Sequence, residues 1–231
     1  MDELWFVRPY DFLHDFNSHA EQELYEIGLT VSINKDQLIF SAGSPGEYVY
    51  ILLEGRIKIY ELTSDGKEVI HWFCFPGELF GLAEIVRGGR RTVAAQACSK
   101  VKLLKIKHSD FVNYMQKYPD VALRIIGLLS CRLRELGDVI TNLVADDVTA
   151  RVMKLLTRLG ARYGSDEGKE VRLNICLTHQ EMADMIGTTR QTVTTVLSSL
   201  KRKDLLRIEN KIIYIQNNDW INSIVDGKII H

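Results

Sequence analysis

Residues 119–143 read PDVALRIIGLLSCRLRELGDVITNL, and this stretch decides how the rest of the chain is organised. Its apolar residues recur at alternating spacings of four and three, the heptad pattern of helices that associate along a narrow seam. Pro119 suits a first-turn position, where its missing N–H costs nothing. At 1.5 Å per residue the helix should be about 36 Å long. The seam residues are Ala122, Ile126, Leu129, Leu133, Leu136, Ile140 and Leu143.

The seam predicts self-association. A surface helix that packs only on its own domain, which is the alternative, usually carries a wider apolar stripe. Here polar residues such as Arg124, Arg134 and Asp138 flank the seam. The sequences before and after the helix differ in character, so we expect two domains joined by one dimerisation helix.

Composition indicates a globular protein. The chain has 231 residues, 46% of them apolar, and a formal net charge of −1. No apolar run approaches the roughly 20 residues needed to span a bilayer. The opening residues lack the basic start and apolar centre of a signal peptide. We therefore expect a cytoplasmic protein with no membrane partner.

Residues 31–106 alternate apolar and polar positions with a period of two, which predicts half-buried strands. The apolar positions include Leu38, Phe40, Val49, Ile51, Ile57, Ile59, Val101 and Leu103. Turn signals such as Pro45-Gly46 and Asp65-Gly66 separate the strands. Short strands at this spacing form a sandwich or jelly roll.

Catalytic and metal-binding patterns are missing from the sequence. Only His71 is expected on a strand of the roll, whereas a metal enzyme of this architecture needs several converging histidines. The four cysteines are Cys74, Cys98, Cys131 and Cys176, and no two of them form a Cys-x-x-Cys pair. We find no nucleophile elbow, P-loop or dinucleotide fingerprint. The sequence predicts no enzyme, no catalytic residue and no metal site.

Residues 76–95 read PGELFGLAEIVRGGRRTVAA. A glycine that opens a tight turn presents backbone N–H groups, and an arginine ten residues later could return beside them to hold an anion. The segment resembles the phosphate-binding cassette of cyclic-nucleotide-binding domains, and with its flanking strands the resemblance covers about residues 30–107. It implies effector-binding roles for Gly81, Leu82, Arg91, Thr92 and, on the long helix, Leu136.

Two departures from that family's pattern count against cyclic AMP. Cyclic-nucleotide binders place a glutamate directly after the glycine, whereas this chain has Leu82, with Glu84 two residues later. Where cyclic-AMP-responsive members read adenine with a Thr-Ser pair, this chain has Leu136 and Gly137. The identity of the effector stays open, and Arg91 could hold another small anion. In the alternative, Arg91 only ties the cassette to the roll.

Related sensors use other cofactors, and the sequence disfavours both. The iron–sulfur sensor needs an N-terminal cysteine cluster, but the first cysteine here is Cys74. The haem sensor uses a cysteine and a histidine around the cassette, where this chain has Gly81 and Ala83.

The C-terminal part predicts two helices joined by a glycine turn. Thr178 and Glu181 form the spacing of a capping box, which starts the first helix. Gly187 ends it, and the second helix buries residues at i, i+3, i+4 and i+7, namely Val193, Val196, Leu197 and Leu200. Residues 205–215 read as a hairpin that turns at Asn210.

These residues resemble the winged helix-turn-helix of the CRP/FNR family of bacterial transcription regulators. The resemblance covers about residues 30–215 in order. It implies backbone contacts to DNA from Thr178 and Gln180, and base contacts from Arg190, Gln191 and Thr195. The full set of expected DNA-binding residues is Thr178, Gln180, Thr189, Arg190, Gln191, Thr194, Thr195 and Arg202. Basic residues cluster here as well: Arg190, Lys201, Arg202, Lys203, Arg207 and Lys211.

We therefore predict an α+β protein with an effector-sensing β jelly roll (1–118), a dimerisation helix (119–145) and a winged helix-turn-helix domain (146–231). The predicted function is an effector-responsive homodimer that binds a palindromic operator in double-stranded DNA, and the family resemblance adds RNA polymerase as a partner. The alternative is a cyclic-nucleotide-binding module that controls a partner protein through its C-terminal helices.

Overall fold

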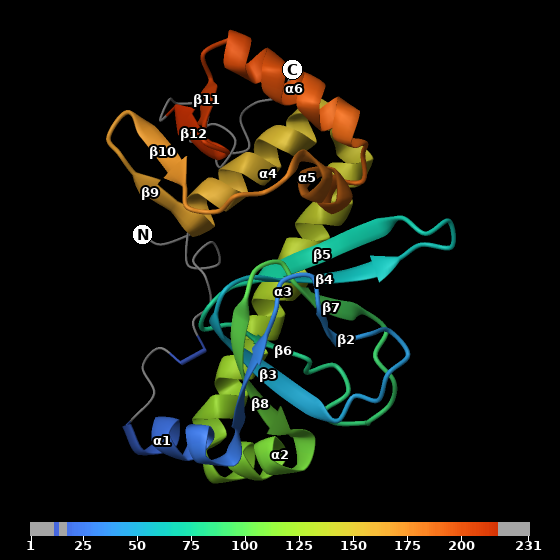
Figure 1. The fold of residues 1–231 in the computed structure, drawn as a ribbon, viewed down its shortest axis with the longest axis vertical. Coiled ribbons are helices and arrows are strands. Elements are labelled where there is room, and N and C mark those ends of the chain that lie inside the picture. Colours follow the sequence, from blue (N-terminus) through green and yellow to red (C-terminus); the bar gives the residue numbers. More distant parts are fainter. Residues whose placement is uncertain (1–11, 14–17, 217–231) are drawn as a thin grey trace. The chain divides into compact units, whose positions relative to one another are not determined.

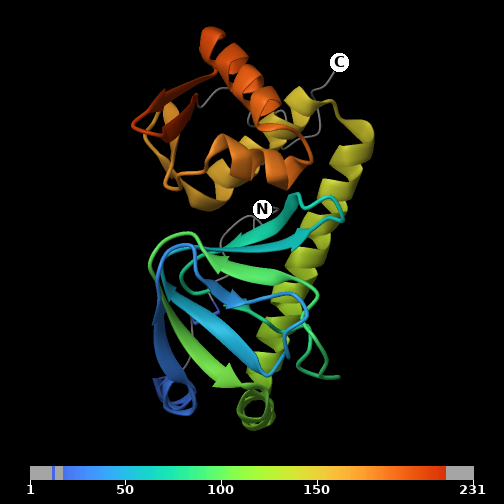
Figure 2. The ribbon, with the colours of Figure 1, turned by 45° about the vertical axis from the view of Figure 1, so that its right-hand side comes forward.

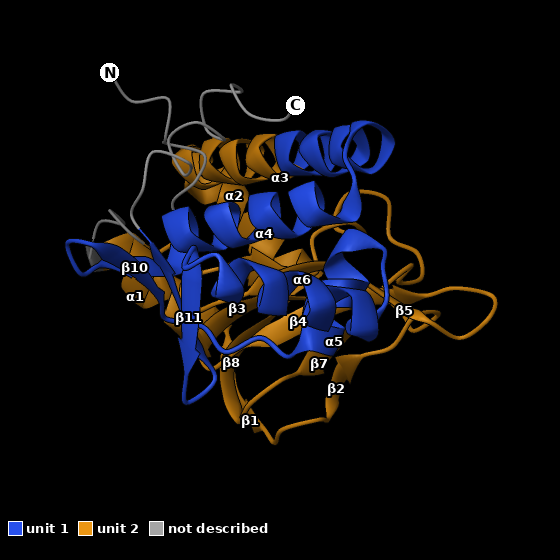
Figure 3. Cartoon of the chain, turned by 90° about the horizontal axis from the view of Figure 1, so that it is seen from above, with its two compact units in different colours: residues 1–9, 133–231 blue, residues 10–132 orange. Residues whose placement is uncertain are grey.

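The computed structural model describes residues 12–13 and 18–216. The chain forms two compact units (Figure 3). In chain order, the first unit ends at Arg132 and is the orange unit 2 of the figure, and the second unit takes up the chain at Leu133 and is its blue unit 1. Apolar and acidic positions alternate over residues 1–29, with Leu24 and Ile27 at helical spacing, and this pattern predicts short helices. The structure has α1 at Ser18–Ile27, and the rest of that prediction lies outside the described residues.

The first unit is built on two antiparallel four-stranded sheets (Figure 1). The first sheet has the order β1-β8-β3-β6, with β1 Leu29–Ile33, β8 Val101–Lys107, β3 Tyr48–Glu54 and β6 Leu79–Phe80. The second has the order β2-β7-β4-β5, with β2 Leu38–Phe40, β7 Ala94–Ala97, β4 Ile57–Leu62 and β5 Glu68–Cys74. The predicted jelly roll is confirmed.

Alternation along the strands builds two cores in this unit. On β3, Tyr50 and Leu52 face the second sheet, whereas Val49 and Ile51 join the apolar cluster beneath the helices. The helices on that side are α1, α2 (His108–Lys117) and the first part of α3, which runs alongside the roll (Figure 2). The strand β3 of the first sheet is therefore buried on both faces.

Helix α3 spans Pro119–Ala145, close to the predicted range. Its inner residues Val121, Ile125 and Leu128 are buried in the helix-side core, and Cys131 is buried one turn later. None of the helices that the structure describes is long and apolar enough to cross a membrane.

The second unit contains the end of α3 and then α4 (Val148–Tyr163), α5 (His179–Ile186) and α6 (Arg190–Arg202). One sheet with the order β11-β12-β10-β9 completes it: β11 Leu206–Glu209, β12 Ile212–Gln216, β10 Glu170–Leu173 and β9 Gly164–Asp166. The two glycines at 164 and 168 predict a loop, but β9 pairs with β10 there. Its Gly-Ser-Asp sequence shows no apolar alternation, so the pattern gave no sign of a strand.

Polar contacts join α3 to α4 within this unit. The Asp147 carboxylate caps α4 by accepting the Ala150 N–H at 2.8 Å. The Lys154 ammonium lies 2.9 Å from Asp146, and the Arg162 guanidinium 2.8 Å from Glu135. The turn between the two helices is therefore held at both ends.

Candidate anion cradle and nucleic-acid interface

Arg91 is the centre of the predicted cradle, and only 4% of its surface is exposed. Its Nη1 donates a 3.0 Å hydrogen bond to the Gly81 carbonyl, and its Nη2 donates to the Tyr48 carbonyl. The guanidinium carbon lies 4.4 Å from the centre of the Phe40 ring, a cation–π distance. The structure therefore brings Gly81 and Arg91 together, next to Phe40 of β2 and Tyr48 of β3.

A buried carboxylate completes this cluster. Glu84 is 6% exposed and forms an ion pair with Nη1 of Arg91. It lies on the turn that was predicted to hold an anion. Gly46 lies against its stem, because a Cβ built on Gly46 would be 2.6 Å from both Cβ and Cγ of Glu84.

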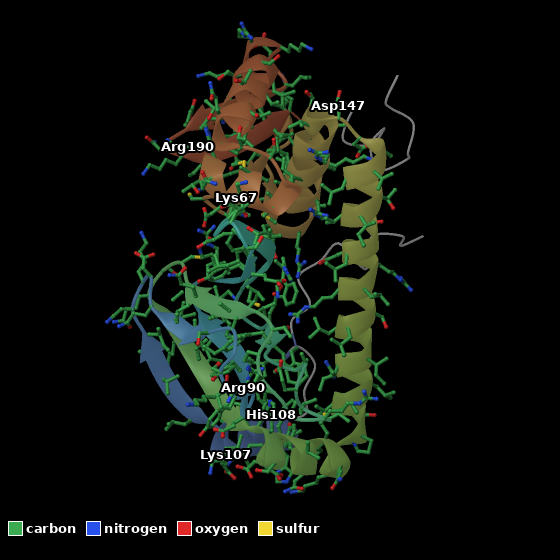
Figure 4. All side chains as sticks on the ribbon, turned by 90° about the vertical axis from the view of Figure 1, so that its right-hand side faces the viewer. Lys67, Arg90, Lys107, His108, Asp147 and Arg190 are labelled. Atoms are coloured by element: carbon green, nitrogen blue, oxygen red, sulfur yellow. The ribbon has the colours of Figure 1, made fainter. Side chains whose placement is uncertain are left out.

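The segment 43–46 holds the cassette in place through its backbone. Gly43 N donates to the Arg91 carbonyl at 2.8 Å, and Arg91 N donates to the Ser44 carbonyl at 2.8 Å. Arg90, labelled in Figure 4, donates a 2.6 Å hydrogen bond from Nη1 to the Gly43 carbonyl. Gly81 has a φ of +79°, a conformation that suits glycine and turns its carbonyl toward Arg91.

The other predicted effector residues differ in burial. Leu82 is buried in the helix-side apolar core, and Thr92 is exposed. Leu136 belongs to the second unit and is exposed. Glu84, Tyr48 and Phe40 were not predicted as site residues. The spacing of seven between Glu84 and Arg91 is the one sequence signal that could have paired the two charges.

His108, at the start of α2, also borders the cluster (Figure 4). Its Nε2 is 3.4 Å from the Gly81 carbonyl, the same oxygen that Arg91 binds. Burial lowers the pKa of His108 and Arg91 lowers it further, whereas the Gly81 carbonyl and Glu84 act in the opposite direction. Burial thus favours a neutral imidazole beside the Arg91 and Glu84 pair.

The expected helix-turn-helix is formed by α5 and α6. The Thr178 hydroxyl accepts the Glu181 N–H at 3.1 Å, and Glu181 accepts the Thr178 N–H at 2.7 Å, so the predicted capping box is confirmed. Gly187 ends α5 with a φ of +65°. Thr189 caps α6 by accepting the Thr192 N–H at 3.2 Å.

Helix α6 buries one face and exposes the other. Val193, Val196, Leu197 and Leu200 are buried, as predicted. The outer face exposes Thr189, Arg190, Gln191, Thr194, Thr195, Ser198 and Arg202. Figure 4 labels Arg190 at the start of this helix. The face offers two guanidinium groups and one amide next to a row of hydroxyls.

The hydroxyls of this row are bonded to their own helix. Thr194 donates to the Arg190 carbonyl at 2.9 Å, and Thr195 donates to the Gln191 carbonyl at 3.1 Å. Nδ1 of His179 lies 2.8 Å from the Thr194 hydroxyl, which links the start of α5 to α6. On α5, Gln180 donates from Nε2 to Asp184 at 2.7 Å and remains exposed.

The predicted wing is the β11–β12 hairpin, which turns at Asn210 and Lys211 with φ values of 50° and 67°. Arg207 was grouped with the basic cluster, but its Nε lies 2.9 Å from both carboxylate oxygens of Glu170. Its guanidinium carbon also lies 3.6 Å from the centre of the Tyr214 ring. Arg207 therefore clamps the wing to β10.

Along α3 the seam residues form an apolar face. Ala122 is half-buried, and the other six predicted seam residues are exposed, with Leu133 72% exposed. Gly137 lies beside Leu136, and a Cβ built on it would contact nothing within 4 Å. Among the described residues, no group of three or more His, Cys, Asp or Glu side chains could hold a metal ion.

Comparison with known proteins places both parts of the chain. A family model described as "Cyclic nucleotide-binding domain" matches residues 30–118, and one described as "Crp-like helix-turn-helix domain" matches residues 150–220. The first match covers the roll and the second covers the helix-turn-helix, and the long helix α3 lies between them in the sequence.

Relatives match over most of their length. The "CRP-like cAMP-activated global transcriptional regulator" of Mycobacterium tuberculosis is 28% identical over 189 residues, which cover 82% of this chain and 84% of that protein. The "Global nitrogen regulator" of Synechocystis sp. is 29% identical over 188 residues, covering 80% and 84%. The structure of FixK2 from Bradyrhizobium japonicum shares the fold, with a TM-score of 0.75 at 24% identity, covering 89% and 99%.

Proposed function

This chain belongs to the CRP/FNR family of DNA-binding transcription regulators, and we propose that it binds a palindromic operator as a homodimer under the control of a small effector. Its relatives are transcriptional regulators, not enzymes. The observation that carries the proposal is the exposed face of α6, which combines Arg190, Gln191 and a row of hydroxyls on a helix capped at both ends.

The bases would be read from the first half of α6. An arginine can pair bidentately with guanine and a glutamine with adenine, and each such pair is worth about 1–3 kcal/mol of discrimination. Arg190 and Gln191 would make these contacts. Thr178, Gln180 and Thr189 at the helix starts would contact phosphates, since N-terminal N–H groups and hydroxyls suit anions.

The seam on α3 supports a homodimer. Leu133, Ile140 and Leu143 form part of an apolar edge that is exposed in the single chain, and exposed apolar patches mark interaction sites. Two copies packed along this edge would be related by a twofold axis. A palindrome with half-sites about one helical turn, or 34 Å, apart follows from that symmetry.

Effector control would be a population shift. An effector changes the fraction of dimers competent for DNA binding only if it binds that arrangement more tightly. A change from 1:99 to 99:1 needs about 5.5 kcal/mol of differential affinity. We place the effector at the Arg91 cradle, and the family resemblance adds RNA polymerase as the partner of the DNA-bound dimer.

The test is selection of random duplex DNA by the full chain, with and without a panel of small anions that includes cyclic AMP and cyclic GMP. An enriched palindrome supports the proposal, and enrichment that requires one anion also identifies the effector. Enrichment of single half-sites would contradict the dimeric operator.

The second candidate is a module that docks on a partner protein. Titration with salt separates the two. Binding that neutralises several phosphates weakens steeply, in proportion to the number of contacts, as salt rises. Docking on a protein need not show this dependence. The exposed Lys201, Arg202 and Lys203 at the end of α6 favour DNA.

A further inference from the structure

We propose that Glu84 is a built-in ligand of the Arg91 cradle, so that cyclic nucleotides and free phosphate are excluded unless the carboxylate is displaced. This inference rests on the proposed function only where it concerns regulation. Whether Glu84 occupies the Arg91 cradle is tested by anion binding alone.

The polar groups that a phosphate would use are already engaged. Nη1 of Arg91 is shared by the Glu84 carboxylate and the Gly81 carbonyl, and Nη2 is taken by Tyr48. Only Nε of Arg91 is buried without a hydrogen-bond partner. Three of the five N–H donors of Arg91 are thus already used, and an incoming anion would meet the negative charge that is bound at Nη1.

The pocket is also shaped around Glu84. Its stem packs where Gly46 has no side chain, with 2.6 Å between an ideal Gly46 Cβ and the Glu84 Cβ and Cγ atoms. Gly46 is buried and its φ is not in the left-handed region, so its backbone does not require glycine there. The missing side chain makes room for the carboxylate.

Like charges in a buried site repel strongly, so an anion could enter only if Glu84 left. The turn that carries it lies at the surface, where Ala83, Val86 and Arg87 are exposed. A rotation of this turn would move the carboxylate into water and free the guanidinium. The effector of this protein must therefore bind Arg91 more favourably than the tethered Glu84 carboxylate does. We expect a simple monoanionic phosphate not to meet this condition.

Two variants of the full chain test the proposal by different routes. Glu84→Gln removes the charge and keeps the shape. Gly46→Ala keeps both charges but leaves no room for the Glu84 stem. Glu54→Gln is the control, because it removes an exposed carboxylate from the same roll. Calorimetry with cyclic AMP, cyclic GMP and inorganic phosphate, together with thermal melting to verify the fold, gives the readout.

We expect wild type and Glu54→Gln to bind none of the probes at millimolar concentration. Glu84→Gln and Gly46→Ala should bind at least one of them about tenfold more tightly or better, and Arg91→Gln added to Glu84→Gln should abolish that binding. Equal affinity in wild type and Glu84→Gln would overturn the proposal, as would folded variants of both kinds that bind no probe. Binding that survives Arg91→Gln would place the site elsewhere and overturn it too.

Selection of duplex DNA with the same preparations keeps the two proposals separate. A failure to enrich any DNA would count against the proposed function and leave the calorimetric result standing.

Discussion

Arg162 of α4 donates a 2.8 Å hydrogen bond to Glu135 of α3, and both side chains are mostly buried. The contact spans the two helices on either side of the turn at Asp146 and Asp147. Lys154 and Asp146 form another charged link at this turn. The orientation of α4, on which the reading helices pack, is thus fixed by ion pairs to the end of α3.

Glu135→Ala should lower the free energy of unfolding of the second unit by about 1–2 kcal/mol, because it leaves Arg162 without its charged partner. A double-mutant cycle with Arg162→Ala isolates the pair. The double variant should cost clearly less than the sum of the single ones. Additive costs would show that the two side chains do not stabilise each other.

The seam on α3 makes a prediction about oligomeric state. Leu136→Asp places a charge on the apolar edge and should yield monomers in sedimentation experiments, with loss of operator binding. Thr141→Asp is the matched control, since Thr141 is exposed on the same helix but off the seam. A Leu136→Asp protein that remains a dimer and binds DNA would assign the interface to another surface.

Arg190→Ala should weaken binding to the selected operator by about 1–3 kcal/mol and relax the preference at one base pair. Arg202→Ala, at the far end of α6, should weaken binding to all DNA sequences about equally. It should also reduce the slope of log K against log salt concentration by about one. Measurement of both variants on matched and mismatched duplexes decides the assignment. A uniform loss for Arg190→Ala would make it a phosphate contact.

The capping box predicts a stability effect that can be separated from DNA binding. Thr178→Ala removes the acceptor for the Glu181 N–H and should cost about 1 kcal/mol. Thr178→Ser keeps an acceptor and should retain the stability. If Thr178→Ala melts like wild type, the cap contributes nothing measurable.

His108 makes the roll sensitive to acid. Because burial lowers its pKa below the ordinary value of 6.5, the unfolded chain binds a proton at a higher pH than the folded chain. The stability due to the neutral imidazole is complete above about 6.5 and is lost as the pH falls from there through the lower folded pKa. Urea unfolding from pH 7.5 downward should show this decline in wild type and a flatter profile in His108→Gln. Parallel profiles would assign the decline to other groups.

Local patterns were sufficient for most of the fold. The period of two along β3 and β8, the heptads of α3 and the caps at Thr178 and Gly187 act between residues near in sequence, so the sequence displays them directly. The strand β9 was missed because its pairing with β10 uses backbone groups of a Gly-Ser-Asp segment with no apolar signal.

Long-range polar partners could not be predicted in the same way. Glu84 was noted only as lying two residues after the position of the family's glutamate. Nothing local shows that Gly46 makes room for it or that Tyr48 and Gly81 also bind Arg91. Arg207 was counted with the basic residues, although it is bound to Glu170, 37 positions away in the chain. Charge content is visible in a sequence, but charge pairing depends on the tertiary fold.

The clamp of Arg207 on Glu170 has a consequence for the energetics of recognition. An isolated two-stranded hairpin is marginally stable in water, but β11 and β12 extend a four-stranded sheet and are tied to β10 by Arg207 and Gln216. The hairpin is ordered before any duplex arrives. Little conformational entropy is then lost at this surface on association, and more of the contact energy remains as affinity.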